Sequence, residues 1–177
     1  MAVHHGRPFA CLKKGLSALE LDADTPFSLC VTGSNTEALL EQAPDIPSFG
    51  DIPAVVEGVR QIVPQAGSVI EIGSQGARFI TDLQSRALQF SVNEHCAGGT
   101  GSFFEDQMSR VGCRLGDYSS LVEQAQSVPR LSGRCAVFAK TDIIHRQQEG
   151  VSTPDILLGL CYAMIRNYKA TIVRRLP

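Results

Sequence analysis

The feature that most constrains this chain is a cysteine followed by a glycine-rich turn and then a helical pattern, within residues 93–106. Gly98, Gly99 and Gly101 let the backbone turn tightly and come close to a ligand. The first N–H groups of a helix have no partner inside the helix, so such a turn attracts negative charge, be it phosphate, thiolate or an anionic cluster. Cys96 stands just before the turn, where a positive helix end lowers the pKa of a thiol and favours the metal-binding thiolate.

Either of two hydroxyl residues is expected to cap the helix after this turn. Thr100 and Ser102 both carry the side-chain oxygen of an N-cap, and Glu105, three residues after Ser102, completes a capping box. The glycine turn lacks the Gly-Lys-Ser/Thr ending of a Walker motif. We therefore interpret it as the link between the cysteine and the helix, which leaves a contact with nucleotide open.

A second cysteine occupies a comparable position. Cys135 follows a turn signal at residues 131–133, and the apolar residues after it fit a helical spacing loosely. Two thiols at helix starts can serve as two ligands of one soft metal centre. Neither Cys96 nor Cys135 belongs to a Cys-x-x-Cys pair, so the sequence contains no self-contained zinc site. A four-thiolate site would need its other two thiolates from a second copy of the chain.

A third motif is a β-branched segment that leads into a glycine turn. Residues 68–72 predict a short buried strand, and the turn 73–76 follows it. Glycines let backbone N–H groups reach phosphates, and Glu71 offers a carboxylate for magnesium-bound water. An ordinary strand followed by a glycine-serine turn is an equally good interpretation. Arg78 could approach a phosphate, but we expect it to form a salt bridge at the strand edge.

The surroundings and the separation of the two cysteines together resemble a known family. Residues 93–101 and 134–142 resemble the two cysteine motifs of the ATP-dependent activators of 2-hydroxyacyl-CoA dehydratases, to which the ATPase subunits of benzoyl-CoA reductase are related (the BadF/BadG/BcrA/BcrD type). The sequence is most similar to the first ATPase-like module of the long CoA-substrate-specific enzyme activases, from about residue 27 to the end. The resemblance implies an α/β fold, part of the actin-like ATPase fold of the acetate and sugar kinase, heat-shock ATPase and actin superfamily. That fold would have a mixed sheet with helices and a helical part that carries the cysteines.

The resemblance also implies a set of sites. Cys96 and Cys135 would be ligands of a single 4Fe–4S cluster shared between two copies of the chain. Glu71 would be the catalytic carboxylate for ATP with magnesium. The remaining nucleotide-binding candidates are Gly73, Ser74, Gln75, Gly98, Gly99, Thr100 and Gly101. Ser74 replaces a glycine of the family motif and Gly76 replaces its usual aspartate, so we expect weak or absent ATPase activity.

Two further motifs of the family are missing from this sequence. One is the Asp-x-Gly-Ser/Thr phosphate hairpin with which its members begin, and the other is the Gly-Gly adenosine-binding turn after the last helices. We therefore expect a fragment that is incomplete at both ends. Residues 1–92 would form a partial actin-like lobe with the second phosphate motif, and residues 93–177 a helical part that carries the two cysteines.

Periodicity and turn residues predict the other elements. Helices are expected at residues 7–19, 36–42 and 52–62, from 102 onward, and from 153 with Thr153 as the cap. Strands are expected at residues 27–32, 78–81 and 88–92, the last two as a hairpin. Cys30 and Cys161 lie in apolar segments and are expected in the core, whereas Lys140 and Asp142 are expected on a solvated helix face.

Charge and composition argue against some partners. The chain has 177 residues and a formal charge of −2 with no basic run, which gives no electrostatic reason for binding nucleic acid or an anionic membrane. Its apolar runs are too short for a transmembrane span, and its start has no signal-peptide pattern. Six cysteines without an export signal predict reduced thiols and a cytoplasmic location.

The leading hypothesis is a module of an ATP-dependent iron–sulfur activator. It would drive one-electron transfer to a 2-hydroxyacyl-CoA dehydratase or a related CoA-ester reductase, with a second copy of the chain as a further partner. One alternative is a non-catalytic ATPase-like interaction or dimerisation module of a longer chain, which the altered Ser74 and Gly76 favour. Another is a thiol enzyme with Cys96 as nucleophile, although the adjacent His95 is a poor base because neighbouring residues rarely point at each other.

Overall fold

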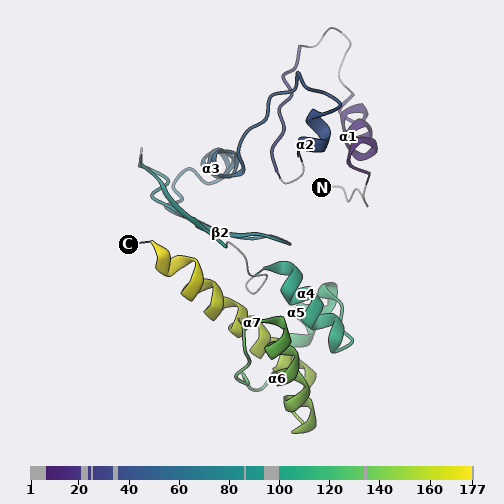
Figure 1. Cartoon of the computed structure of the whole chain (residues 1–177), viewed down its shortest axis with the longest axis vertical. Coiled ribbons are helices and arrows are strands. Elements are labelled where there is room, and N and C mark those ends of the chain that lie inside the picture. Colours follow the sequence, from purple (N-terminus) through teal and green to yellow (C-terminus); the bar gives the residue numbers. More distant parts are fainter. Residues whose placement is uncertain are drawn as a thin grey trace. The chain divides into compact units, whose positions relative to one another are not determined.

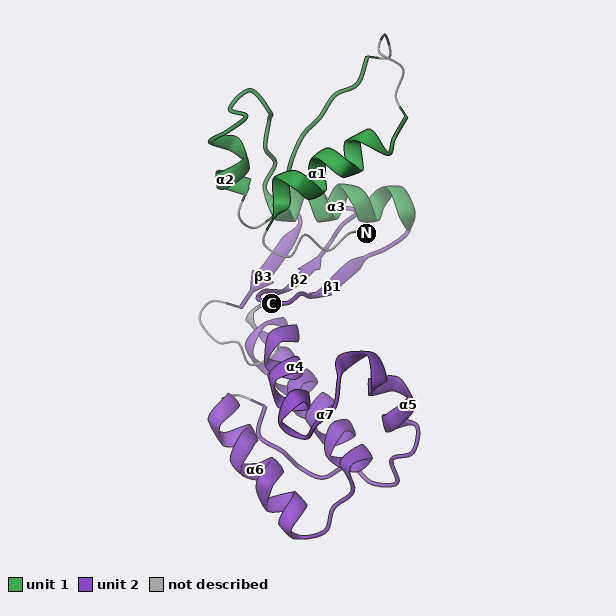
Figure 2. Ribbon diagram, turned by 90° about the vertical axis from the view of Figure 1, so that its right-hand side faces the viewer, with its two compact units in different colours: residues 1–64 green, residues 65–177 purple. Residues whose placement is uncertain are grey.

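The computed structural model describes residues 7–20, 24, 26–33, 36–85, 87–93, 100–133 and 135–176. These residues fall into two compact units, 1–64 and 65–177, which Figure 2 colours separately. The strands belong to the second unit, together with the helices that follow them along the chain (Figure 1). The division expected at residue 92 lies inside this second unit, and as a domain boundary of the intact fold it stays a prediction.

The described residues of the first unit form three helices. These are α1 (Pro8–Ser17), α2 (Thr36–Leu40) and α3 (Asp51–Ile62), and they confirm the helices predicted there to within two residues at each end. A turn at Gly33 is tied to the start of α3. Gly33 has a φ of 111°, which glycine adopts without strain, and its N–H donates to Asp51 Oδ1 at 3.0 Å. Because Asp51 is the first residue of α3, this turn has a structural role.

The strand predicted at residues 27–32 is wrong. Among these residues only Val31 pairs, in an isolated parallel bridge with Ser48. A strand needs a neighbour along its length, and this apolar run has a partner at a single position. Phe27 and Cys30 are exposed, so Cys30 is a surface thiol rather than the core residue we expected.

The second unit begins with a three-stranded sheet. In it β1 (Ser68–Ile72), β2 (Ala77–Thr81) and β3 (Gln89–Val92) pair in that order. Both pairs are antiparallel, so β2 and β3 are the predicted hairpin. The chain combines this sheet with helices, which confirms the predicted α/β class. β1 has the predicted bounds but is an edge strand and is not buried: Ile70 exposes 64% of its surface.

Helices make up the rest of the second unit among the described residues. The α-helices are α4 (Gly101–Arg110), α5 (Tyr118–Val122), α6 (Ala136–Gln148) and α7 (Thr153–Thr171), and the 3₁₀ helices are η1 (Leu115–Asp117) and η2 (Val173–Arg175). The N-cap of α7 is Ser152 rather than the predicted Thr153, because the Ser152 hydroxyl accepts the Asp155 N–H at 3.3 Å. In the part of the chain that the structure describes, no helix is long and apolar enough to cross a membrane.

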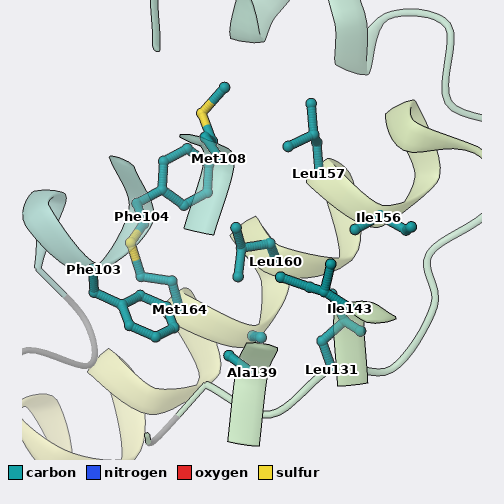
Figure 3. Close-up of a cluster of buried hydrophobic side chains, with 11 residues drawn as sticks. Phe103, Phe104, Met108, Leu131, Ala139, Ile143, Ile156, Leu157, Leu160 and Met164 are labelled. Carbon is teal, nitrogen blue, oxygen red and sulfur yellow. The ribbon is translucent and has the colours of Figure 1, made fainter. Parts of the chain in front are cut away.

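The core of the second unit lies where α4, α6 and α7 meet (Figure 3). Its buried members are Phe103, Phe104, Met108, Leu131, Ala139, Ile143, Ile156, Leu157, Leu160, Ala163 and Met164. Cys161, which we expected in the core, is half-buried and packs against this cluster. Towards its C-terminus α7 packs on the sheet, where Tyr168 and Ile172 meet Ala77. α7 therefore joins the sheet to the other helices and supports both predicted motifs on one scaffold.

Candidate functional site

The loop between β1 and β2 carries the predicted phosphate motif. The Gly73 N–H donates to Gly76 O at 2.7 Å and closes the loop, and Ser74 and Gln75 are exposed. Among the described residues, no acceptor is present for the backbone N–H groups of Ser74, Gln75 and Gly76. Successive unpaired amide groups in a short loop form the kind of concavity that binds phosphate oxygens. The loop therefore fits a phosphate group by its donors.

Helix α4 begins on this loop. The Gly101 N–H donates to Gly73 O at 2.8 Å, and the Ser102 N–H donates to Ser74 O at 2.9 Å. The Ser102 hydroxyl also binds Ser74, donating to its carbonyl oxygen and lying 3.2 Å from its Oγ. The first N–H groups of α4, which have no partner inside the helix, thus find theirs in the predicted phosphate loop.

The predicted capping box of α4 is wrong. Thr100 occupies the N-cap position and its side chain makes no capping hydrogen bond. Ser102 lies inside the helix and uses its hydroxyl on Ser74 instead. Thr100 is fully buried, so this nucleotide-binding candidate does not face solvent.

The first cysteine motif is held at both of its described ends. At its N-terminal end, Asn93 pairs with β2: the Ala77 N–H donates to Asn93 Oδ1 at 2.6 Å, and the Asn93 N–H donates to Ala77 O at 3.0 Å. At its C-terminal end, Gly101 bonds to the β1–β2 loop, as above. Both ends of the motif are therefore fixed to the hairpin that β1 and β2 form. The predicted residues Cys96, Gly98 and Gly99 lie outside the described residues, as does His95.

Glu71, the predicted catalytic carboxylate, forms a salt bridge with Arg78. The two residues face each other across β1 and β2, and Arg78 Nη1 lies 3.2 Å from Glu71 Oε2. This confirms the structural role expected for Arg78. The Tyr168 hydroxyl donates to Arg78 O at 2.5 Å. Burial, and then the charge of Glu71, raises the pKa of Tyr168 to about 12. A role for Glu71 in magnesium binding has to compete with its pairing to Arg78.

Cys135, the second predicted ligand, is placed at a helix start as the sequence predicts. It is the N-cap residue of α6, with extended backbone angles, and its side chain is half-buried. A half-exposed thiol at the N-terminus of a helix is a suitable ligand for an anionic metal cluster. Among the described residues, no group of three or more His, Cys, Asp or Glu side chains is arranged to hold a metal ion.

The segment before Cys135, which we call the strap (residues 129–133), lies directly against the backbone of α7. A Cβ atom placed on Gly133 would lie 2.1 Å from Ala163 O, and one on Gly159 would lie 2.5 Å from Pro129 O. Both glycines are therefore required for the close approach of the two backbones. The contact explains why a glycine precedes the second cysteine motif, which the sequence showed only as a turn signal.

Side chains from α6 and α7 also hold the strap. Asp142 Oδ2 accepts the Ser132 N–H at 2.8 Å, and Arg166 Nη2 donates to Leu131 O at 3.1 Å. Leu131 is buried in the core. Asp142, expected on a solvated helix face, is half-buried and also has this structural role, whereas Lys140 is exposed as expected. The spacing of Asp142 from Cys135, seven residues or two helical turns, was the available signal that both lie on one face of α6.

Comparisons with known proteins agree on one family. A family model described as the BadF/BadG/BcrA/BcrD ATPase family matches residues 13–176. The activator of lactoyl-CoA dehydratase from Anaerotignum propionicum is 34% identical over 113 residues, which cover 63% of this chain and 44% of that protein. A benzoyl-CoA reductase subunit from Thauera aromatica is 32% identical over 117 residues, which cover 66% of this chain and 42% of that protein. The chain thus spans about half the length of the curated relatives it matches.

A solved structure supports the fold. The activator of the 2-hydroxyisocaproyl-CoA dehydratase from Clostridium difficile, with bound ADPNP, superimposes with a TM-score of 0.82 at 24% identity. The match covers 97% of this chain and 63% of that structure. It confirms the actin-like ATPase fold that the sequence resemblance implies.

Proposed function

Because the chain belongs to the BadF/BadG/BcrA/BcrD ATPase family, we propose that it is a module of an ATP-dependent activator of a 2-hydroxyacyl-CoA dehydratase or a related CoA-ester reductase. Relatives named as an activator of lactoyl-CoA dehydratase and as part of benzoyl-CoA reductase support this class of partner. The observation that carries the proposal is the attachment of α4 to the β1–β2 loop. It connects a phosphate-type loop to the helix that follows the first cysteine motif.

The β1–β2 loop would bind the phosphates of ATP. The N–H groups of Ser74, Gln75 and Gly76 would donate to phosphate oxygens, and Gly73 keeps the loop closed. Gly98 and Gly99 would contribute backbone donors. The Gly101 N–H is already bonded to Gly73 O, so Gly101 would act by holding the loop, with the buried Thr100 supporting the turn. When bound, ATP supplies the free energy of hydrolysis. Ser74 and Gly76 still predict that hydrolysis by this chain is slow.

Movement of the loop would be passed to α4 through its backbone. A shift of Gly73 and Ser74 displaces the acceptors of the Gly101 and Ser102 N–H groups. Residues 94–99, which include Cys96, immediately precede this helix start. The loop's position would therefore bias the position of the first cysteine motif.

Cys96 and Cys135 would bind one 4Fe–4S cluster together with the same two cysteines of a second copy of the chain. The half-buried thiol of Cys135 at the start of α6 supports this assignment. When bound, the cluster would carry one electron at a time to the dehydratase or reductase partner. The strap is fixed against α7 at Gly133, two residues before Cys135, and this attachment would limit the movement of the thiolate.

A second candidate function is a non-catalytic ATPase-like interaction or dimerisation module. The ion pair between Glu71 and Arg78 favours it, because the carboxylate expected to serve magnesium already has a cationic partner. Calorimetry with ATP and magnesium separates the two functions. Clear binding supports the activator, and its absence supports the interaction module.

The coupling is tested by two substitutions at one position. Gly101→Pro removes the N–H that binds Gly73 O while suiting the first position of a helix, and Gly101→Ala keeps that N–H. The extended backbone of Thr100 is compatible with a following proline. After anaerobic reconstitution, addition of ATP with magnesium should change the electron paramagnetic resonance spectrum of the reduced wild type and of Gly101→Ala. The same spectrum in Gly101→Pro should not respond. Equal responses in all three proteins would contradict the coupling.

A further inference from the structure

A cleft of about 830 Å³ lies between the strap, one face of α6 and the C-terminal half of α7. The two helices lie side by side in both views (Figures 1 and 2). The cationic side chains that line the cleft are Arg130, Arg146, Arg166, Lys169 and Arg174. Asp142 is the acidic residue in its lining. Five of the chain's 16 Lys and Arg residues thus gather in one cleft of a chain whose net charge is −2, so the local charge is opposite to that of the whole.

The described residues neutralise only a small part of this positive charge. Arg146 pairs with Glu149 at 2.7 Å. Asp142 is engaged with the Ser132 N–H. Arg130, Lys169 and Arg174 are exposed and have no ion-pair partner in the part of the chain that the structure describes. Like charges that line one concave surface raise the local concentration of anions.

We propose that this cleft binds a small polyanion that carries phosphate groups. Its volume is within the range of about 300–1,000 Å³ typical of small-molecule sites. The guanidinium groups of Arg130, Arg166 and Arg174 match phosphate oxygens in a two-pronged geometry, and the Lys169 ammonium adds a point charge. The Arg166 side chain is already held in place by its bond to Leu131 O, so less entropy is lost when it binds a ligand.

The anion site goes beyond the cluster and the nucleotide loop. Cys135 lines the cleft, but most of the positive charge comes from residues that take no part in thiolate ligation. The β1–β2 loop contributes no residue to the lining. Binding of the anion should therefore persist in a Cys135→Ser protein, and a failure of the cluster assignment would leave this inference intact.

The test is calorimetry on the whole 177-residue chain, with inorganic pyrophosphate and adenosine 3′,5′-bisphosphate as probes. Both should bind, more weakly as salt is added. A Lys169→Gln/Arg174→Gln protein should bind each probe at least about tenfold more weakly, because two charged hydrogen-bond donors are lost. Arg130→Gln should also weaken binding. Lys140→Gln is the matched control: it removes one charge from the exposed side of α6, outside the cleft, and should leave the dissociation constant unchanged.

The two probes distinguish the source of the phosphate. Equal affinity for both indicates recognition of the phosphates alone, whereas tighter binding of the bisphosphate indicates a nucleotide-borne group. The proposal is overturned if neither probe binds, or if Lys140→Gln weakens binding as much as the cleft variants. It is also overturned if binding responds to Gly101→Pro and not to the cleft variants, which would place the anion at the β1–β2 loop. Binding of an acidic oligoglutamate peptide but of neither phosphate compound would make the cleft a docking surface for an acidic protein segment instead.

Discussion

The starts of α4 and α6 each follow a predicted ligand cysteine, but they are held in different ways. α4 is held by hydrogen bonds to a loop whose residues Ser74 and Gln75 are exposed, and a Cβ on Gly101 would still lie 3.2 Å from Gly73 O. α6 follows a strap whose backbone touches that of α7, where a Cβ on Gly133 would lie 2.1 Å from Ala163 O.

The difference indicates that the two helix starts have different roles. The strap contributes Leu131 to the buried core, which also includes Leu160 of α7. Closely packed interiors resist small displacements. The β1–β2 loop lies at one end of the sheet, and the N–H groups of residues 74–76 have no acceptor among the described residues. Substitutions at the strap should therefore change stability, whereas substitutions at the loop should change the response to nucleotide. The predictions that follow run from the largest expected effect on stability to the smallest.

Gly133→Ala and Gly101→Ala make the comparison at matched glycines. At Gly133 the new methyl group would overlap Ala163 O, and both clashing groups belong to backbone. We expect a loss of about 3 kcal/mol in the free energy of unfolding. At Gly101 the neighbour needs to move by only a few tenths of an ångström, and alanine gains about 0.5–1 kcal/mol as a helix former. Urea unfolding measures both, and equal losses would contradict the difference between strap and loop.

Asp142→Ala removes the acceptor that holds the strap to α6. The Ser132 N–H would lose its partner, and an unsatisfied part-buried donor costs about 1–3 kcal/mol. Asp142→Asn keeps an acceptor oxygen and is the control, with a smaller loss expected. If thermal unfolding shows the same stability for Asp142→Ala and wild type, then this bond does not hold the strap.

Tyr168→Phe tests the junction between α7 and the sheet. The variant loses the bond to Arg78 O, which should cost about 1 kcal/mol at neutral pH. In the wild type the folded pKa of Tyr168 is raised to about 12, whereas the unfolded value is 10.0. Between these values the unfolded chain releases the proton and the folded chain keeps it, so stability falls as pH rises from 10 to 12. Unfolding curves over this interval should show a smaller fall in Tyr168→Phe, and an identical fall would exclude a buried, protonated Tyr168.

Ser102→Ala should have the smallest effect on stability, about 0.5–1 kcal/mol, because the backbone bond from residue 102 to Ser74 O remains. It should nevertheless weaken the attachment of α4 to the loop. Ser109→Ala on the same helix removes a hydroxyl that binds Asp106 O and is the control. In calorimetry with ATP and magnesium, Ser102→Ala should change the heat of binding more than Ser109→Ala does. Equal heats in the two variants would show that the hydroxyl plays no part in nucleotide binding.

Local signals predicted most of the elements, and long-range contacts account for the errors. The strand at residues 68–72 and the start of α6 at Cys135 follow from β-branched residues, glycines and turn signals nearby in the sequence. The missing strand at residues 27–32 has an equally apolar pattern, but a strand also requires a partner that its own sequence cannot reveal.

In the candidate site, too, the local sequence does not reveal contacts between distant segments. Gly73 and Gly101 were each recognisable as glycine turns, yet the hydrogen bond between them joins segments 28 residues apart (101 − 73). The tight contact of Gly133 with Ala163 and the bond from Asp142 to the strap likewise depend on how α6 and α7 pack. A turn signal identifies a glycine, and only the packing shows what the glycine allows to come close.

The most direct test of the account is anaerobic reconstitution with iron and sulfide of the wild type and of single cysteine variants. We expect a cluster with broad visible absorption, together with association of two chains, in the wild type. The same result is expected for Cys30→Ser, which removes an exposed thiol far in sequence from both motifs. Cys96→Ser and Cys135→Ser should each bind little or no cluster. Equal iron and sulfide contents in all four proteins would contradict the assignment of Cys96 and Cys135 as ligands and, with it, the proposed electron transfer.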